Sequence, residues 1–274
     1  MNAPLIPQAN PGAAFRSRRD ALLDVLDGGW YINGKQVRQF EESFAAFCSV
    51  KHAVGVGNGT DAIEVALRAL GIGKGGLVFT VSHTAVATVA AIECAGATPV
   101  LVDVDPVTYT MSPESLAKAL EAARAGRYPG KPAAVLPVHL YGCCADLDAI
   151  RAVAGDLPLI EDCAQAHGAA YKGRPAGSTG IAGTFSFYPT KNLGAVGDGG
   201  CVVTFDDALA ERIRSVREYG WRMHYLSSEP GINTRLDELQ AAFLNVLLPE
   251  LPAKNAKRRA LAELYRRELS GVPG

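Results

Sequence analysis

The chain has 274 residues, of which 48% are hydrophobic and 20% are charged, as is typical of a soluble globular protein. Its 27 Lys and Arg against 28 Asp and Glu give a formal net charge of −1, which argues against a general nucleic-acid binder. We expect a cytoplasmic protein, because no signal peptide and no membrane-spanning segment is recognisable. The six cysteines form no C-x-x-C pair, which favours reduced thiols over a disulfide framework or a metal site.

Strand and helix patterns alternate from about residue 53 onward. Short apolar, β-branched runs predict seven buried strands: Ala53–Val56, Leu77–Val81, Pro99–Val104, Ala133–Val138, Pro158–Glu161, Thr184–Tyr188 and Cys201–Thr204. Helical spacing predicts the helices between and after them: Asp61–Leu70, Thr84–Cys94, Pro113–Arg124, Asp146–Ala154, Asp206–Tyr219 and Arg235–Leu248. This order predicts an α/β fold of three layers, α/β/α, around a mostly parallel seven-stranded sheet.

Helical segments also flank this core. Two helices are expected before the first strand, and a charged helix is expected to end at Leu269. The segment Gly220–Asn233 has the composition of a loop, and we interpret the basic run Lys254–Arg259 as a solvated helix face. The predicted organisation is an N-terminal helical segment (1–52), a large domain (53–248) and the start of a linker helix (249–274).

Two carboxylates, Glu161 and Asp162, end an apolar strand. Open α/β sheets bind their ligands beyond such strand ends. A buried, ionised Asp162 needs a cationic or N–H partner. The sequence leaves three cationic partners open: the protonated nitrogen of a heterocycle, a metal ion with His167 nearby, or an arginine.

A lone lysine, Lys191, stands between an apolar strand and a run of glycines that ends at Gly200. Lysine in a low-dielectric site loses its proton more readily and then becomes a Schiff-base nucleophile. The simpler alternative is a surface-loop lysine. The charge-poor residues before Lys191 and the glycines after it argue against that alternative.

Two further strand ends carry weaker signals. The segment 54–61 reads as a strand, a glycine turn and a helix start, which offers free N–H groups to a phosphate. It matches neither the dinucleotide fingerprint nor the P-loop, so an ordinary tight turn is the better interpretation of this segment alone. His83 suits ring stacking or hydrogen bonding, and a buried core histidine is equally consistent with the sequence.

Ordered motifs along nearly the whole chain resemble the DegT/DnrJ/EryC1/StrS group of sugar aminotransferases, which are fold-type I pyridoxal-phosphate (PLP) enzymes. These motifs include Gly57-Asn-Gly-Thr-Asp61, Ser82-His-Thr84, Pro137-Val-His-Leu-Tyr-Gly142, Glu161-Asp-Cys-Ala-Gln-Ala-His-Gly168, Phe185-Ser-Phe187, Lys191-Asn-Leu-Gly194, Gly197-Asp-Gly-Gly200 and Gly231-Ile-Asn-Thr-Arg235. Each is weak alone, and their number and order make the resemblance specific.

The resemblance implies a role for each candidate. Lys191 resembles the lysine that holds PLP as a Schiff base and moves the substrate proton, and Asp162 resembles the carboxylate that keeps the pyridine nitrogen protonated. Gln165 matches the residue beside the phenolic oxygen of the ring. The implied phosphate contacts are Gly59, Thr60, Ser186 and, from the other subunit of a homodimer, Asn233. Relatives usually carry an aromatic residue at the position of Ala85, so His83 is the candidate for the stacking contact here.

The implied reaction transfers an amino group from L-glutamate to a keto-sugar on a nucleoside diphosphate, with Arg222 and Arg235 as candidate cations. Relatives continue for about a hundred residues, the size of a small domain, so a C-terminal domain is expected to be absent here. The alternatives are a PLP-binding member without transaminase activity and a truncated, inactive fragment. A nucleotide-dependent oxidoreductase would leave Lys191 and Asp162 without a role. No metal is expected.

Overall fold

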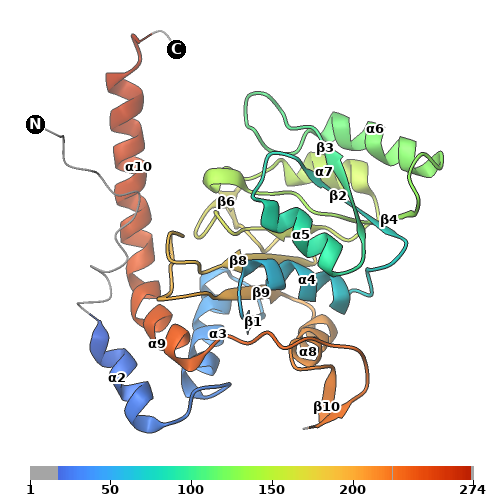
Figure 1. The fold of residues 1–274 in the computed structure, drawn as a ribbon. Coiled ribbons are helices and arrows are strands. Elements are labelled where there is room, and N and C mark those ends of the chain that lie inside the picture. The colour runs from blue at the N-terminus through green and yellow to red at the C-terminus, as the bar shows by residue number, and fades with distance from the viewer. Residues whose placement is uncertain (1–17, 224, 273–274) are drawn as a thin grey trace, which may run out of the picture.

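Seven strands form the centre of the molecule, in two sheets (Figure 1). The computed structural model describes residues 18–223 and 225–272, so the expectation about a signal peptide concerns a segment outside the described residues. The larger sheet has the order β1 (His52–Val56), β9 (Gly200–Thr204), β8 (Ala182–Ser186) and β5 (Ile160–Asp162). The smaller, parallel sheet has the order β3 (Thr98–Val102), β2 (Gly76–Val81) and β4 (Lys131–Val135). Each predicted strand therefore overlaps an observed one.

The predicted single seven-stranded sheet is not confirmed. The chain beyond β4 runs beside β5, but only through isolated parallel bridges, one of which joins Val138 to Asp162. Pro137 and Pro158 lie in this junction and have no N–H to donate, so a continuous ladder cannot form there. β9 is antiparallel to both β1 and β8, whereas β5 and β8 are parallel.

Helices pack on both faces of the four-stranded sheet. Side chains alternate along a strand, so Val54 of β1 joins one hydrophobic cluster while Ala53 joins another. The first cluster draws on α4 (Gly59–Ala69), α5 (Val86–Cys94), α6 (Pro113–Arg124), α7 (Leu147–Ala154) and α8 (Asp207–Val216). The second draws on α2 (Arg19–Gly28), α3 (Lys35–Phe47) and α9 (Glu238–Leu247).

Aromatic packing fixes the end of β8, where several candidate residues lie. Phe44 of α3 contacts Phe185 and Phe187 edge to face, with ring centroids 5.0 and 5.3 Å apart, and Phe40 contacts Phe187 in the same way at 5.1 Å. All four rings are fully buried. Such pairs are favourable beyond their buried area, so β8 has little freedom to move against α3.

The N-terminus of α3 is completed by a distant residue. Gly34, which precedes the helix, provides no side-chain cap. The buried carboxylate of Glu238, in α9, instead accepts hydrogen bonds from the backbone N–H groups of Gly34, Gln36 and Val37 at 2.8–2.9 Å. These N–H groups would otherwise lack partners within the helix.

The connections differ most from prediction. The expected loop Gly220–Asn233 contains a hairpin of β10 (Trp221–Met223) and β11 (Leu226–Ser227), and a second small hairpin joins β6 (Ala170–Tyr171) to β7 (Arg174–Pro175). Strands this short carry no readable periodicity. Short 3₁₀ turns occur at Leu140–Gly142 and Leu248–Glu250.

The final helix, α10 (Leu251–Glu268), extends away from the sheets (Figure 1). In the described part of the chain, no helix combines the length and apolarity needed to cross a bilayer.

Candidate active site

Asp162 ends β5 as a buried carboxylate. Its Oδ2 accepts a hydrogen bond from the Thr88 hydroxyl at 2.8 Å, and its Oδ1 accepts one from the backbone N–H of Ala164 at 3.1 Å. Burial raises the pKa of Asp162, although both hydrogen bonds and the charge of Lys191 oppose the rise. Among the described residues no arginine forms an ion pair with Asp162, which removes one of the three partners left open by the sequence.

Lys191 lies in the turn after β8 and is partly buried. Its backbone N–H donates to the Tyr188 carbonyl oxygen at 2.8 Å. A Cβ on Gly194 would lie 2.6 Å from the carbonyl oxygen of Pro189, so this turn closes only with glycine there. Burial lowers the pKa of Lys191, and the nearby charge of Asp162 partly opposes this. Lys191 is therefore partly buried and within electrostatic range of the buried carboxylate of Asp162.

The start of α4 touches the end of β8. The Asn58 side chain caps α4 by accepting the Asp61 N–H at 2.9 Å, and Gly59 and Thr60 form the first turn, where N–H groups lack partners within the helix. A Cβ on Gly59 would lie 2.5 Å from Cβ of Ser186, so only glycine permits this approach. Gly59 thus meets Ser186 at a helix N-terminus, and Thr60 follows directly, an arrangement suited to a phosphate.

His83 is exposed, so it is not the core histidine that the sequence allowed. Its ring meets Tyr109 and Tyr141 edge on, with centroids 5.8 and 6.4 Å away. The backbone N–H of Tyr141 donates to Oε1 of Gln165 at 3.0 Å, which connects His83 to a second candidate. Both tyrosines have left-handed backbones, with φ of 57° and 55°, and such conformations in bulky residues concentrate at functional sites.

A cavity of about 810 Å³ opens beside these residues. Its lining includes Gln165, Lys191 and Tyr141, together with Arg258 and Arg259 of α10. No carboxylate belongs to its described lining, so the cavity is cationic. The basic run that the sequence analysis interpreted as a solvated helix face therefore contributes two arginines to the cavity wall.

Asn233 is exposed, and its backbone forms an isolated antiparallel bridge with Glu218. Within residues 18–223 and 225–272, no side-chain hydrogen bond links Asn233 to the other candidates. The neighbouring Thr234 hydroxyl does reach α4, because it accepts the Gly57 N–H at 2.8 Å and donates to Asp61 at 2.6 Å. Of the candidate nucleotide cations, Arg235 lies 3.8 Å from Glu218.

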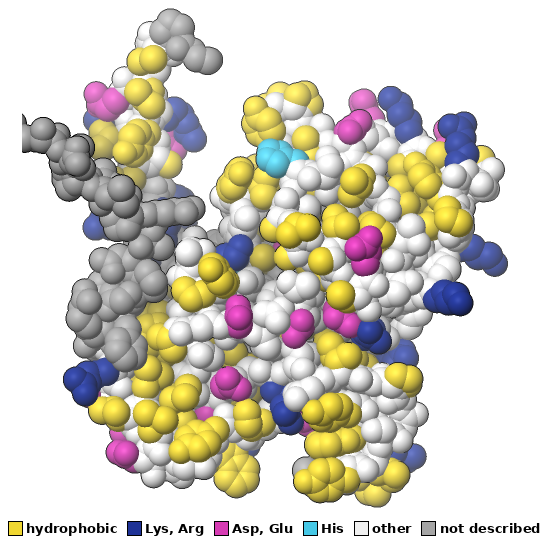
Figure 2. Space-filling view, in the orientation of Figure 1, with side chains coloured by type: hydrophobic (Ala, Val, Ile, Leu, Met, Phe, Trp, Pro, Cys, Tyr) yellow, Lys and Arg dark blue, Asp and Glu magenta, His cyan; other side chains and the backbone are white. Residues whose placement is uncertain are grey.

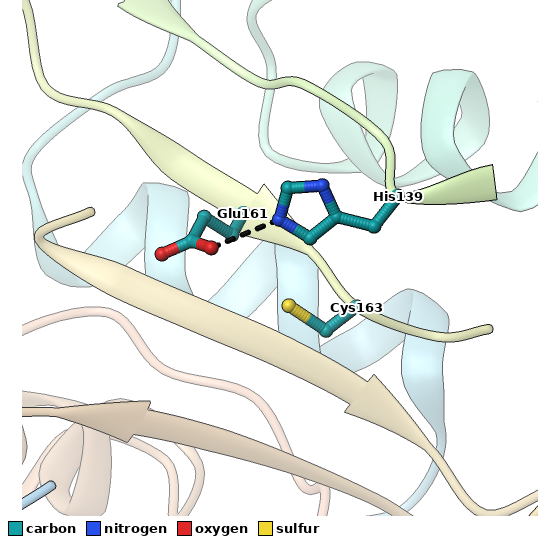
Figure 3. A group of neighbouring side chains, drawn as sticks. All are labelled: His139, Glu161 and Cys163. Atoms are coloured by element: carbon teal, nitrogen blue, oxygen red, sulfur yellow. Dashed lines mark hydrogen bonds and ion pairs between the residues drawn. The ribbon is translucent and has the colours of Figure 1, made fainter. Parts of the chain in front are cut away.

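Behind Asp162, the side chains of His139, Glu161 and Cys163 have metal-ligand atoms within 4.8 Å of one another (Figure 3). The lone pairs of His139 and Glu161 are already used. Nε2 of His139 donates to Glu161 at 2.9 Å, and its Nδ1 accepts the Ala145 N–H at 3.1 Å. The Glu161 carboxylate also accepts three backbone N–H groups at 2.7–2.9 Å, from Gly177, Thr179 and Gly180. Burial raises the pKa of Cys163 well above its usual value, so the thiol keeps its proton, and the cluster is a structural network.

His167, which the sequence offered as a metal-binding partner for Asp162, is buried beside the rings of Phe185 and Phe187. Burial lowers its pKa to about 3, so the imidazole is neutral. The Asn255 side chain donates to its carbonyl oxygen at 2.7 Å, which ties α10 to this segment. His167 is thus a neutral core residue that lines the inner wall of the cavity.

Sequence reasoning gave no functional role to four residues at or beside the site. Thr88 had no signal, because a threonine inside a helical pattern is usually a packing residue. Tyr141 was part of a recognised motif but received no role, and its left-handed backbone is invisible in sequence. Arg258 and Arg259 were noticed as charges, but the cavity wall they form depends on how α10 packs.

Comparison with known proteins gives consistent matches over almost the entire chain. The DegT/DnrJ/EryC1/StrS aminotransferase family profile matches residues 15–274. The erythromycin biosynthesis sensory transduction protein EryC1 of Saccharopolyspora erythraea is 50% identical, over 100% of this chain and 74% of its own length. The dTDP-3-amino-3,4,6-trideoxy-α-D-glucose transaminase of Streptomyces venezuelae is 46% identical, over 99% and 71%. The crystal structure of S. venezuelae DesV with a ketimine intermediate has a TM-score of 0.93 and 45% identity, covering 99% of this chain and 73% of that one. The chain belongs to the DegT/DnrJ/EryC1/StrS aminotransferase family.

Proposed function

We propose that the protein is a PLP-dependent sugar aminotransferase. The observation that carries the proposal is that Asp162 is buried and that Lys191, which lies within its electrostatic range, is partly buried with a pKa lowered by burial. A buried carboxylate without an arginine partner suits a protonated heterocycle, and a lysine with a lowered pKa suits Schiff-base chemistry. Membership of an aminotransferase family and the transaminase name of the S. venezuelae relative support the same reaction.

The residues present fit this cofactor. Asp162 would hold the ring nitrogen, Lys191 the aldehyde carbon, and Gln165 the phenolic oxygen. The contact between Gly59 and Ser186, which a Cβ on Gly59 would prevent, forms one wall of a phosphate site together with Thr60. His83 would face the ring, and Asn233 of a second subunit would complete the phosphate site.

When bound, PLP supplies a ring that accepts the electrons left behind as Cα of the amino donor loses its proton. The chain's own residues handle that proton. The lowered pKa of Lys191 enlarges the fraction that is a free amine, which is the form that can accept this proton at Nζ. The ionised Asp162 keeps the positive charge on the ring nitrogen, which is what makes the ring an electron acceptor.

Both proposed substrates, L-glutamate and a keto-sugar on a nucleoside diphosphate, are anions. The cationic cavity bounded by Lys191, Arg258 and Arg259 suits such molecules. A homodimer would cover the exposed hydrophobic side chains that gather near the connection between α2 and α3 and on the hairpin of β10 and β11 (Figure 2). They are Trp30, Tyr31, Ile32, Met223, Tyr225 and Leu226.

The test is the visible absorption spectrum of the purified protein with added PLP, before and after L-glutamate, with Lys191→Ala in parallel. We expect a band that Lys191→Ala lacks and that glutamate converts to the pyridoxamine form. A Lys191-dependent band that glutamate leaves unchanged would favour a second candidate, a PLP-binding protein without transaminase activity. This second candidate is supported by the name of EryC1, a 50% identical relative that is described as a sensory transduction protein. Absence of any band would refute the cofactor assignment.

A further inference from the structure

Two threonine hydroxyls form a chain that ends on the buried carboxylate. Thr88, fully buried in the first turn of α5, lies 2.8 Å from Asp162 Oδ2. The Thr84 hydroxyl, partly exposed just before α5, lies 2.8 Å from that of Thr88. Thr84 directly follows His83, so this chain of contacts connects the carboxylate at the end of β5 to the loop that presents His83.

The charge on Asp162 sets the direction of this chain. An ionised carboxylate can only accept, so the single hydroxyl proton of Thr88 must point to Asp162. The Thr88 oxygen then accepts the proton of Thr84. Every hydroxyl proton therefore points toward the negative charge, and the arrangement favours the ionised carboxylate.

Asp162 depends on these donors more than its neighbour Glu161 depends on any one of its own. Glu161 accepts four hydrogen bonds, whereas Asp162 accepts two, from Thr88 and Ala164. The Ala164 N–H is fixed by the backbone, so among the described residues Thr88 is the only side-chain donor to Asp162. Losing it would leave Oδ2 of a buried charge without a partner.

We propose that Thr88, assisted by Thr84, is a positioning residue for cofactor binding: it keeps Asp162 ionised and holds the His83 loop against it. The inference rests on the proposed function, since Asp162 and His83 are there assigned to the ring nitrogen and the ring face. The two linked hydroxyl groups would thereby position both Asp162, at the ring nitrogen, and His83, on the face of the same ring. The hydroxyl groups of Thr84 and Thr88 take no part in the chemical step.

The experiment compares PLP dissociation constants, measured from the Lys191-dependent absorption band, for wild type and Thr88→Val, Thr88→Ser and Thr84→Val. A hydrogen bond to a charged group is worth enough that Thr88→Val should weaken PLP binding about ten- to a hundredfold. Thr88→Ser keeps the hydroxyl and should bind close to wild type. Thr84→Val should have a smaller effect, and none in a protein that already carries Thr88→Val, because the chain is then broken.

The matched control is Thr80→Val. Thr80 is a fully buried threonine on β2 whose hydroxyl donates to the Leu136 carbonyl oxygen at 2.9 Å. Its replacement should lower the melting temperature of the apoprotein, as Thr88→Val can, while leaving PLP affinity unchanged. This separates positioning of the cofactor site from loss of stability.

Equal PLP affinities for wild type and Thr88→Val would overturn the inference, as would a Thr88→Ser variant as weak as Thr88→Val. If Thr88→Val does not fold, Thr84→Val decides: weaker PLP binding at an unchanged melting temperature supports the inference, and wild-type binding overturns it. A wild-type protein without a Lys191-dependent band refutes the proposed function itself, and this inference with it.

Discussion

Replacing Glu161 by glutamine changes one atom in a side chain that is completely buried. The carboxylate accepts two bonds on each oxygen: Oε2 from His139 and the Gly177 N–H, and Oε1 from the N–H groups of Thr179 and Gly180. A glutamine keeps one acceptor oxygen and turns an NH₂ toward the other two donors. His139 cannot avoid the clash between donors by switching to the tautomer protonated at Nδ1, because Nδ1 already accepts a backbone N–H.

Two hydrogen bonds to a charged group are therefore lost in either orientation of the amide. At about 1.5–3 kcal/mol each, and allowing for partial relaxation, Glu161→Gln should lower the free energy of unfolding by about 3–5 kcal/mol. Urea denaturation of the apoprotein at pH 7 measures this. The control is Glu211→Gln, which removes one partner of an exposed ion pair with Arg214 and should cost under about 1 kcal/mol.

Acidification supplies a second readout. Burial raises the pKa of Glu161, but the hydrogen bond from His139 and the N–H groups of Gly180 and Gly177 outweigh it and lower the pKa overall. A carboxyl with a lowered pKa contributes stability that is present above its unfolded pKa and lost as the pH falls through the folded value. The difference in free energy of unfolding between wild type and Glu161→Gln should therefore become smaller at pH values below the ordinary pKa of glutamate. If Glu161→Gln lowers the free energy of unfolding by less than about 1 kcal/mol at pH 7, the hydrogen bonds to Glu161 do not stabilise the fold as argued.

Three further outcomes are expected. Asp162→Asn should raise the melting temperature of the apoprotein at pH 7 and abolish the PLP band. Burial raises the pKa of Asp162, so ionising this carboxyl costs stability as the pH rises. A gain in melting temperature that persists at pH 3 would contradict this explanation. Gly59→Ala should weaken PLP binding at least about tenfold while the far-ultraviolet circular dichroism stays native, since the added Cβ would lie 2.5 Å from a neighbouring Cβ and must displace the start of α4. Arg258→Gln with Arg259→Gln should raise KM for at least one anionic substrate severalfold, whereas Lys257→Gln, which does not line the cavity, should leave both KM values unchanged.

The elements of this fold could be predicted from sequence because each has a local signature. Ser112 and Pro113 mark the start of α6, and the structure begins that helix at Pro113 with the Ser112 side chain accepting the Ser115 N–H. The seven strands of the two central sheets were predictable for the same reason. How they join was not, since the break between the two sheets depends on prolines in two segments that meet only in the folded chain.

The candidate site divides in the same way. Asp162 and Lys191 were recognisable because a carboxylate and a lysine at strand ends break an apolar pattern. Their perturbed pKa values depend on burial, which sequence indicates only roughly. Thr88 was not recognisable, because its contact with Asp162 spans 74 positions and exists only once tertiary packing has brought α5 to the end of β5.

The long-range cap on α3 has a consequence for the order in which the chain acquires structure on the ribosome. Glu238 is synthesised 201 to 204 positions after the N–H groups it completes. An isolated helix of 13 residues is marginal in water, so α3 leaves the ribosome without the contacts that stabilise it. β1 is in the same position, because its sheet partner β9 emerges about 150 residues later. α3 and β1 are therefore translated long before they can become native, and a nascent-chain chaperone would have to protect both until β9 and α9 have emerged.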